Sequence, residues 1–423
     1  MNTLERKLPI GIQTFEDIRR GNYLYVDKTS ILWQIINTGK PYFLSRPRRF
    51  GKSLLVSTFE AYFQGRKDLF EGLAIEKLET KWEQYPVLHL DLNAKRYETA
   101  ADLVAMLNQY LEKWEAVYGD EKKDRSPEER FSYIIEQAYL KTGKGVVVLV
   151  DEYDKPLLQA LLDENLLDEY RRILKAFYGV LKSSDRYLRF IFLTGVTKFA
   201  QVSVFSDLNQ LNDISMKIPY ANICGITKKE LVSTFTPELE HLAEVQEMSF
   251  EDTVDKMTAM YDGYHFTYSE EGLFNPFSVL NVFDGLMFDN YWFQTGTPTY
   301  LVELLKQSDY DLRLLIDGLE VGSSGFAEYR AETKNPLPMI YQSGYLTSDE
   351  TDFNAVKFVR ELQLGDVHSF MERMKSFFAD IPYELNTKTE RHYQVIFYLV
   401  FKLMGQYVDA EVRSAKGRAD AVV

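Results

Sequence analysis

The sequence contains a single cysteine, Cys224, among 423 residues. One cysteine can form neither an internal disulfide nor a cysteine zinc cluster, so a reducing compartment fits best, and we expect a cytoplasmic protein. The five histidines are scattered, and no pair of them has the spacing of metal ligands. The residues that most often build a zinc site are therefore too few here.

Long hydrophobic runs are also missing. No apolar stretch approaches the roughly twenty residues that cross a bilayer, and the first residues, Met1 to Lys7, have no signal-peptide core. We therefore expect no membrane partner.

Positive charge is in deficit, with a net charge of −14. Because a general nucleic-acid binder is expected to be basic, DNA or RNA contacts would have to come from local patches. Two such patches occur, one at Arg46, Arg48, Arg49 and Lys52 and one at Arg413, Lys416 and Arg418. A nucleotide's phosphates explain the first patch better, and the second is short, as solvated surface clusters usually are.

Residues 41–63 have the layout of a phosphate-binding loop. An apolar run at Tyr42 to Leu44 is followed by Gly51, Lys52 and Ser53 and then by a helix-periodic segment. The glycine lets the backbone approach a phosphate, the lysine supplies a charge to the terminal phosphates, and the serine hydroxyl can bind Mg2+. The usual first glycine of this motif is replaced by Arg46, so the loop is a variant.

A second motif follows at residues 146–152. The continuous run Val146 to Val150 is typical of a buried parallel strand, and it ends on Asp151 and Glu152. In nucleotide hydrolases the first acid holds Mg2+ and the next can activate water. Taken singly, either motif could be an ordinary helix start or cap, but the ordered pair favours nucleotide chemistry.

The surrounding segments alternate between strand and helix patterns. We predict strands at 86–92, 146–150 and 188–195 and helices at 99–119, 127–142 and 156–184. This alternation predicts a three-layer parallel sheet with ligands at the carboxyl ends of its strands. Thr194, with Lys198 as a second candidate, would then sense the terminal phosphate. Four aromatic and apolar residues before the loop have two interpretations, a wall for an adenine ring or simple packing on the sheet. They are Ile10, Phe15, Tyr23 and Tyr25.

Past about residue 220 the pattern becomes mainly helical, beginning with a capping box at Thr227 and Glu230. In the last block we predict a helix over about 390–405 and a two-stranded pair at 408–412 and 419–423. No internal repeat is found.

Several strings resemble the bacterial AAA-ATPase-like family over nearly the whole chain. They include Tyr25-Val-Asp-Lys-Thr29, Phe43-Leu-Ser-Arg-Pro-Arg-Arg-Phe-Gly-Lys-Ser53, Val150-Asp-Glu-Tyr-Asp-Lys-Pro156 and Leu193-Thr-Gly-Val-Thr-Lys198. The variant loop with Arg46 is that family's own form. The resemblance implies a C-terminal PD-(D/E)XK nuclease domain. In such a domain an acid on a helix, an acid on a strand and a Glu-x-Lys motif on the next strand surround a divalent metal.

In that comparison Glu390 matches the helix acid and Asp420 the strand acid, so both are candidate nuclease metal ligands. The Glu-x-Lys strand is absent before Val423, so we expect either a truncated sequence or a naturally short form. Without the resemblance, Glu390 is a helix-start carboxylate and Asp420 a surface residue.

The fold predicted is an α/β P-loop NTPase domain (1–220), a mainly helical lid or winged-type domain (221–350) and a partial nuclease-like domain (351–423). The function predicted is a Mg2+-dependent ATPase that switches a C-terminal module acting on DNA or RNA. Ser53 and Asp151 would hold Mg2+, and Lys52, Glu152 and Thr194 would act in catalysis. The predicted nucleotide contacts are Arg48, Arg49, Gly51, Lys52, Ser53 and Leu54.

Two alternatives stay open. A non-catalytic, nucleotide-gated scaffold that recruits a protein partner fits the acidic composition, although Glu152 would then have no use. A small-molecule kinase lacks an acceptor-site signature. The sequence also leaves open whether the chain forms a homo-oligomer and whether Arg171, Arg172 or Arg189 serves as an arginine finger.

Overall fold

A computed structural model describes residues 6–93, 95–161, 163–198, 204–205, 210–266, 272–291, 305, 336–342, 409–414 and 417–422. The chain divides into two compact units, one of residues 1–262 and 266–287 and the other of residues 263–265 and 288–423. The candidate site lies within the first unit. The boundaries 220 and 350 between domains stay a prediction.

A five-stranded sheet in the order β2-β3-β4-β1-β5 forms the centre of the first unit. Its neighbouring strands are parallel. The strands are β1 (Pro41–Ser45), β2 (Val87–Asp91), β3 (Val146–Asp151), β4 (Leu188–Gly195) and β5 (Asn212–Asp213). Every residue of β3 is buried, as the apolar run predicted. The order sets β4 between β1 and β3, so their carboxyl ends meet at one edge.

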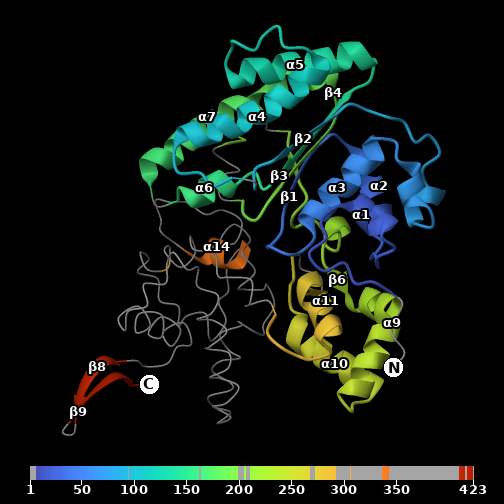
Figure 1. The fold of residues 1–423 in the computed structure, drawn as a ribbon, viewed down its shortest axis with the longest axis vertical. Helices are drawn as coiled ribbons and strands as arrows, with labels where there is room; N and C mark the ends of the chain where they lie inside the picture. Colours follow the sequence, from blue (N-terminus) through green and yellow to red (C-terminus); the bar gives the residue numbers. More distant parts are fainter. Residues whose placement is uncertain are drawn as a thin grey trace. The chain divides into compact units, whose positions relative to one another are not determined.

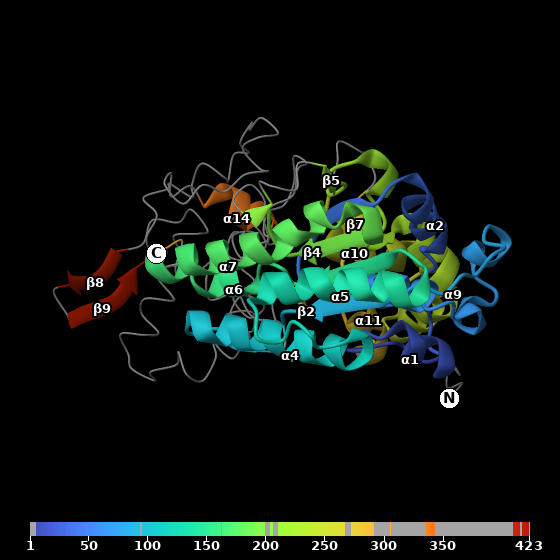
Figure 2. The ribbon, with the colours of Figure 1, turned by 90° about the horizontal axis from the view of Figure 1, so that it is seen from above.

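Helices cover both faces of this sheet, which confirms the predicted three layers (Figures 1 and 2). One face carries α1 (Phe15–Arg20), α2 (Thr29–Thr38) and α3 (Lys52–Phe63), and the other carries α4 (Ala100–Tyr118), α5 (Pro127–Thr142) and α7 (Glu164–Ser183). Short 3-10 turns lie at Lys67–Phe70, Ala74–Lys77, Asp185–Tyr187 and Ile218–Tyr220.

Local capping explains where the outer helices begin. Ser126 and Glu129 form a capping box at the start of α5, with Pro127 in the first turn. Thr99 and Asp102 do the same for α4. Both helices were predicted from the sequence and are confirmed.

The single helix predicted over 156–184 is wrong. The structure has a short α6 (Lys155–Gln159) and then α7, which begins after Asp163. The Asp163 side chain accepts a hydrogen bond from the backbone N–H of Leu166 and so caps a new helix.

Three further helices belong to the same unit: α9 (Lys228–Val245), α10 (Phe250–Tyr261) and α11 (Pro276–Gly285). The predicted capping box at Thr227 and Glu230 starts α9. Two short strands pair antiparallel: β6 (Ile226–Thr227), which directly precedes α9, and β7 (Leu273–Phe274), which precedes α11. Pro237 lies inside α9, beside a non-helical Phe235, and kinks it.

The second unit is described at α14 (Leu337–Gln342) and at an antiparallel pair, β8 (Asp409–Ser414) and β9 (Gly417–Val422). The pair confirms the two strands predicted near the end of the sequence. Glu390 and the helix predicted over 390–405 lie outside the described residues, as do most of residues 292–350.

The pairing of Arg130 on α5 with Glu115 on α4 gives a first prediction. Nε of Arg130 lies 2.7 Å from Oε1 of Glu115, and both side chains are buried. Arg130→Leu alone leaves a buried carboxylate unpaired, so we expect the free energy of unfolding to fall by about 3–5 kcal/mol. The double variant Glu115→Leu/Arg130→Leu should recover most of this loss in urea unfolding curves. A double variant as unstable as the single one would contradict the role of the pair.

Candidate nucleotide site

The phosphate loop joins β1 to α3, and its backbone requires glycine at one point. Gly51 has φ +90° and ψ +20°, the left-handed region, and precedes Lys52, the first residue of α3. A Cβ at Gly51 would meet no atom within 4 Å, so the backbone angle and not the space selects glycine. The first turn of α3 presents backbone N–H groups that lack intrahelical partners, the feature on which a phosphate-binding loop relies.

Arg46 does not take part in this phosphate cluster, contrary to the expectation from the sequence. Its side chain is buried, and its guanidinium lies 4.2 Å from the ring centre of Phe266. The guanidinium donates to carbonyl oxygens of Ser45, Ser215, Tyr220 and Ala221. Arg46 therefore fixes the start of the loop to the segment after β5.

Lys52 and Glu152 form an ion pair beside the loop. Nζ of Lys52 lies 3.2 Å from Oε1 of Glu152 and donates to the carbonyl oxygen of Pro47 at 3.3 Å. The Lys52 and Glu152 side chains are 3% and 15% exposed, so little water screens the pair. The two motifs found in the sequence thus meet in space.

The Asp151 carboxyl lies beside the start of α3, where the Ser53 hydroxyl hydrogen-bonds to it. Burial, reinforced by the charge of Glu152, raises the pKa of Asp151 to about 6, against the opposing effects of Ser53 and Lys52. A buried carboxyl and a hydroxyl are hard oxygen donors of the kind that Mg2+ prefers. The donor set therefore fits the predicted Mg2+ site.

Asp154 connects the loop after β3 to the loop after β4, a role that was missed in the sequence. Its buried carboxylate accepts hydrogen bonds from the N–H groups of Val196 and Thr197 and from the Thr197 hydroxyl, at 3.2, 2.7 and 2.7 Å. Gly195 leaves room for this contact, because a Cβ there would lie 2.6 Å from Cδ1 of Tyr153 and would clash with Asp154. Glu152, with φ +52°, belongs to the loop held in this way.

The two residues predicted to sense the terminal phosphate contact other parts of the protein. Thr194 is fully buried, and its hydroxyl donates to the carbonyl oxygen of Leu44 at 2.9 Å. Nζ of Lys198 lies 2.8 Å from Oδ2 of Asp213 on β5. Neither residue lines the cavity described next. The sensor role of Thr194 stays a prediction.

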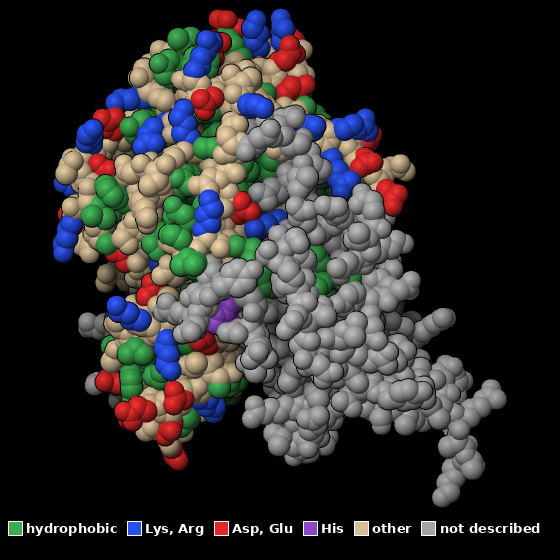
Figure 3. All heavy atoms as spheres, turned by 180° about the vertical axis from the view of Figure 1, so that it is seen from behind, with side chains coloured by type: hydrophobic (Ala, Val, Ile, Leu, Met, Phe, Trp, Pro, Cys, Tyr) green, Lys and Arg blue, Asp and Glu red, His purple; other side chains and the backbone are tan. Residues whose placement is uncertain are grey.

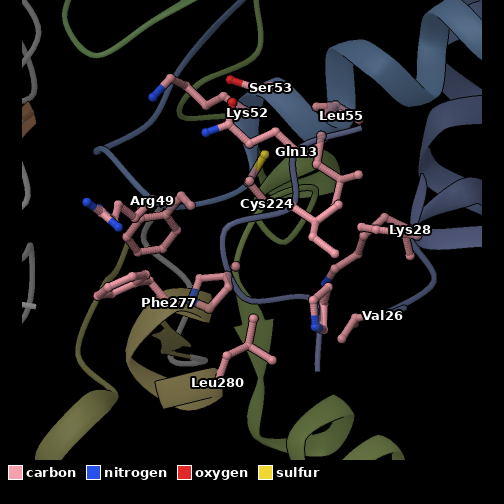
Figure 4. A pocket seen from close by; sticks show the side chains of 18 of the residues that line it. Gln13, Val26, Lys28, Arg49, Lys52, Ser53, Leu55, Cys224, Phe277 and Leu280 are labelled. Atoms are coloured by element: carbon pink, nitrogen blue, oxygen red, sulfur yellow. The ribbon is translucent and has the colours of Figure 1, made fainter. Parts of the chain in front are cut away.

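A cavity of about 450 Å³ opens beside the loop, within the size range of small-molecule sites (Figure 4). All six predicted nucleotide contacts line it: Arg48, Arg49, Gly51, Lys52, Ser53 and Leu54. Glu152 and Lys155 also line it. Apolar lining residues include Pro9, Ile12, Val26, Phe277 and Leu280, and Figure 4 shows Val26 and Leu280 on the far side of the cavity from Lys52 and Ser53.

Of the four residues considered for an adenine wall, Tyr25 lines the cavity. Phe15 instead packs in the core, with its ring centre 4.9 Å from that of Phe70. The walls on the apolar side come from the N-terminal segment, as predicted but mostly through other residues such as Pro9 and Ile12, and from α11, which was not predicted. No single local pattern pointed to them, because they are far apart in the sequence.

Two contacts join these walls to the loop and to α9. The Arg49 guanidinium lies 4.1 Å from the ring centre of Phe277. Nζ of Lys28 donates to Oε1 of Glu230 at 2.6 Å, the same glutamate that caps α9. The Cys224 thiol also lines the cavity, and burial raises its pKa.

The metal-ligand role of the two predicted nuclease residues stays a prediction, because only one of them is described. Asp420 lies on β9, and Glu390 is outside the described ranges. Among the described residues, no cluster of three or more His, Cys, Asp or Glu side chains could hold a metal. Nor does any described helix have the length and apolar character of a membrane span.

Comparisons with known proteins agree with this geometry. A family model described as predicted AAA-ATPase matches residues 9–205, and a PD-(D/E)XK nuclease superfamily model matches residues 388–423. The chain is 34% identical over 464 residues to an uncharacterized protein in the vnfD 5' region of Azotobacter chroococcum mcd 1. That alignment covers 99% of this chain and 87% of the relative.

Gly195 gives a prediction for this site. Gly195→Ala forces Asp154 and Tyr153 to move, so we expect it to lower the free energy of unfolding by about 1–3 kcal/mol. Gly179 on α7 is a matched control, because a Cβ there meets nothing within 4 Å. Gly179→Ala should stabilise the helix by up to about 1 kcal/mol. Equal melting temperatures for the two variants would show that the close approach at Gly195 does not matter.

Proposed function

Because the chain belongs to the predicted AAA-ATPase family, we propose that it binds ATP with Mg2+ in the cavity beside Lys52 and hydrolyses it. The pairing of Lys52 with Glu152 at 3.2 Å carries this proposal. A protein that only binds nucleotide has no need of a carboxylate at this point.

The nucleotide lies with its phosphates on Gly51, Lys52 and Ser53 and with its base toward the apolar end of the cavity. Lys52 exchanges its ion pair with Glu152 for the terminal phosphates, as a phosphate-loop lysine does. Glu152 is then free to accept a proton from water.

Hydrolysis follows from this exchange. As the water oxygen bonds to the terminal phosphorus, the bridging oxygen–phosphorus bond breaks and ADP leaves. The proton of the water passes to Glu152, the general base. The N–H groups at the start of α3 and the Lys52 ammonium stabilise the charge that develops on the phosphate oxygens.

Ser53 and Asp151 would hold Mg2+, which when bound neutralises the phosphates' charge. Their buried, hydrogen-bonded oxygens support this assignment. ATP binding orders the contacts between the phosphate loop, the N-terminal segment and α11, since all three line one cavity. We propose that this ordering is the switch that controls the C-terminal module.

The C-terminal module acts on nucleic acid in this proposal, and the nuclease-superfamily match at residues 388–423 supports it. On the face drawn in Figure 3, basic side chains of the described residues are interspersed with acidic ones. The net charge of −14 likewise gives the chain as a whole no attraction for a polyanion.

Two substitutions test the ATPase. Lys52→Ala should abolish binding of Mg2+-ATP, because it removes the charge on the terminal phosphates. Glu152→Gln should bind Mg2+-ATP normally and hydrolyse it about 10²–10⁴ times more slowly, since it removes the general base. Phosphate release and equilibrium binding measure the two effects, and Glu169→Gln, an exposed acid on α7, is the control.

Wild-type turnover that Glu152→Gln leaves unchanged would contradict the role of Glu152. Binding of ATP without any turnover, the same in Glu152→Gln, would instead support a nucleotide-gated scaffold.

Removal of Mg2+ gives a further prediction. EDTA should stop hydrolysis by the wild type, and added Mg2+ should restore it. Ser53→Ala should raise the Mg2+ concentration needed for half-maximal turnover, because it removes one oxygen donor. A Mg2+ dependence identical to that of the wild type would exclude Ser53 as a ligand.

A further inference from the structure

Two cations at the phosphate end of the cavity are not engaged by the described residues. Arg48, on the phosphate loop, and Lys155, directly after Asp154, both line the cavity. Other lysines and arginines of the lining are occupied: Lys28 by Glu230, Arg49 by Phe277 and Lys52 by Glu152. The side chains of Arg48 and Lys155 form no hydrogen bond or ion pair with a described residue.

The positive charges of Arg48 and Lys155 repel one another. Burial lowers the pKa of Lys155 and the neighbouring Arg48 lowers it further, whereas the charges of Glu152, Asp154 and Asp91 raise it. An anion that lies between Lys155 and Arg48 therefore relieves the repulsion between their two charges.

The carboxylates near Lys155 are committed to other donors. Glu152 pairs with Lys52, and Asp154 accepts three hydrogen bonds from Val196 and Thr197. Asp91, at the end of β2, accepts from the N–H of Asn93 at 2.8 Å. None of these carboxylates is hydrogen-bonded to the Lys155 side chain, so the anion that suits Lys155 and Arg48 comes from a ligand.

The backbone of Lys155 is well fixed. Its N–H donates to the carbonyl oxygen of Glu152 at 3.0 Å. Asp154, the preceding residue, holds the same turn against the loop after β4. The residue proposed as general base and this lysine therefore belong to one hydrogen-bonded turn, and both line the cavity.

We propose that Lys155 contacts the terminal phosphate of the bound nucleoside triphosphate, together with Arg48. This inference rests on the proposed function. Lys155 supplies from within the chain the positive charge that other phosphoryl-transfer enzymes receive from an arginine finger. It acts on the equatorial oxygens, where negative charge spreads as the bridging bond breaks.

The arginines suggested as fingers by the sequence have other contacts in this chain. Arg189 donates to the carbonyl oxygen of Ile36, at the opposite end of β4 from the phosphate loop. Arg171 pairs with Asp168 on the same helix. If the positive charge comes from Lys155 of the same chain, no second chain is needed. Turnover per chain is then independent of protein concentration.

The test compares Lys155→Gln with Lys155→Arg, and with Lys182→Gln as a control on the exposed side of α7. Affinities for ADP and for a non-hydrolysable ATP analogue are measured with Mg2+, and turnover is measured over a range of protein concentrations. Retained ADP binding reports that a variant has folded.

For Lys155→Gln we expect about tenfold weaker binding of the ATP analogue, unchanged binding of ADP and turnover reduced about 10²–10³-fold. Lys155→Arg should keep most of the turnover, and Lys182→Gln should match the wild type. Equal weakening of ADP and analogue, or unchanged turnover, would overturn the inference while leaving the ATPase intact. Turnover per chain that rises with protein concentration would also overturn it. A wild type that binds no nucleotide would instead refute the proposed function itself.

Discussion

The Asp154 carboxylate is the contact on which the site depends. It holds the turn after β3 to the loop after β4 through the N–H groups of Val196 and Thr197, and it lies fully buried. Glu152 and Lys155 project from this turn on either side of it. The direction of both side chains into the cavity therefore follows from one buried carboxylate and from the absence of a side chain at Gly195.

Arg46 has a comparable role on the other side of the site. At the position where phosphate loops usually have their first glycine, it places a buried cation against backbone carbonyls of the segment after β5. The loop thereby gains an anchor in the protein and loses none of its phosphate-binding backbone, because Gly51 still provides the left-handed turn. This physical role explains how the variant loop keeps its form.

Local signals in the sequence were enough for the strands β1 to β4 and for many helix starts, but the two-residue strand β5 was not predicted. The apolar run at residues 146–150 and the capping boxes at Ser126 and Thr227 act over a few residues, and each predicted its element correctly. The break between α6 and α7 was missed because the apolar periodicity continues through it, although Asp163 is a plain capping signal.

The roles of Asp154 and Arg46 could not be read from local patterns. Asp154 bonds to a residue 43 positions later and Arg46 to one 169 positions later, so only the folded chain shows them. For the same reason the sequence suggested Ile10, Phe15, Tyr23 and Tyr25 as a wall, whereas Tyr25 alone of these lines the cavity, together with residues of α11 such as Phe277 and Leu280.

The central claim is that the cavity beside Lys52 is a nucleoside triphosphate site. Calorimetric titration of the wild-type chain with the non-hydrolysable ATP analogue, with and without Mg2+, tests it most directly. The account predicts one site per chain whose affinity depends on Mg2+. No binding at millimolar nucleotide in the presence of Mg2+ would contradict it.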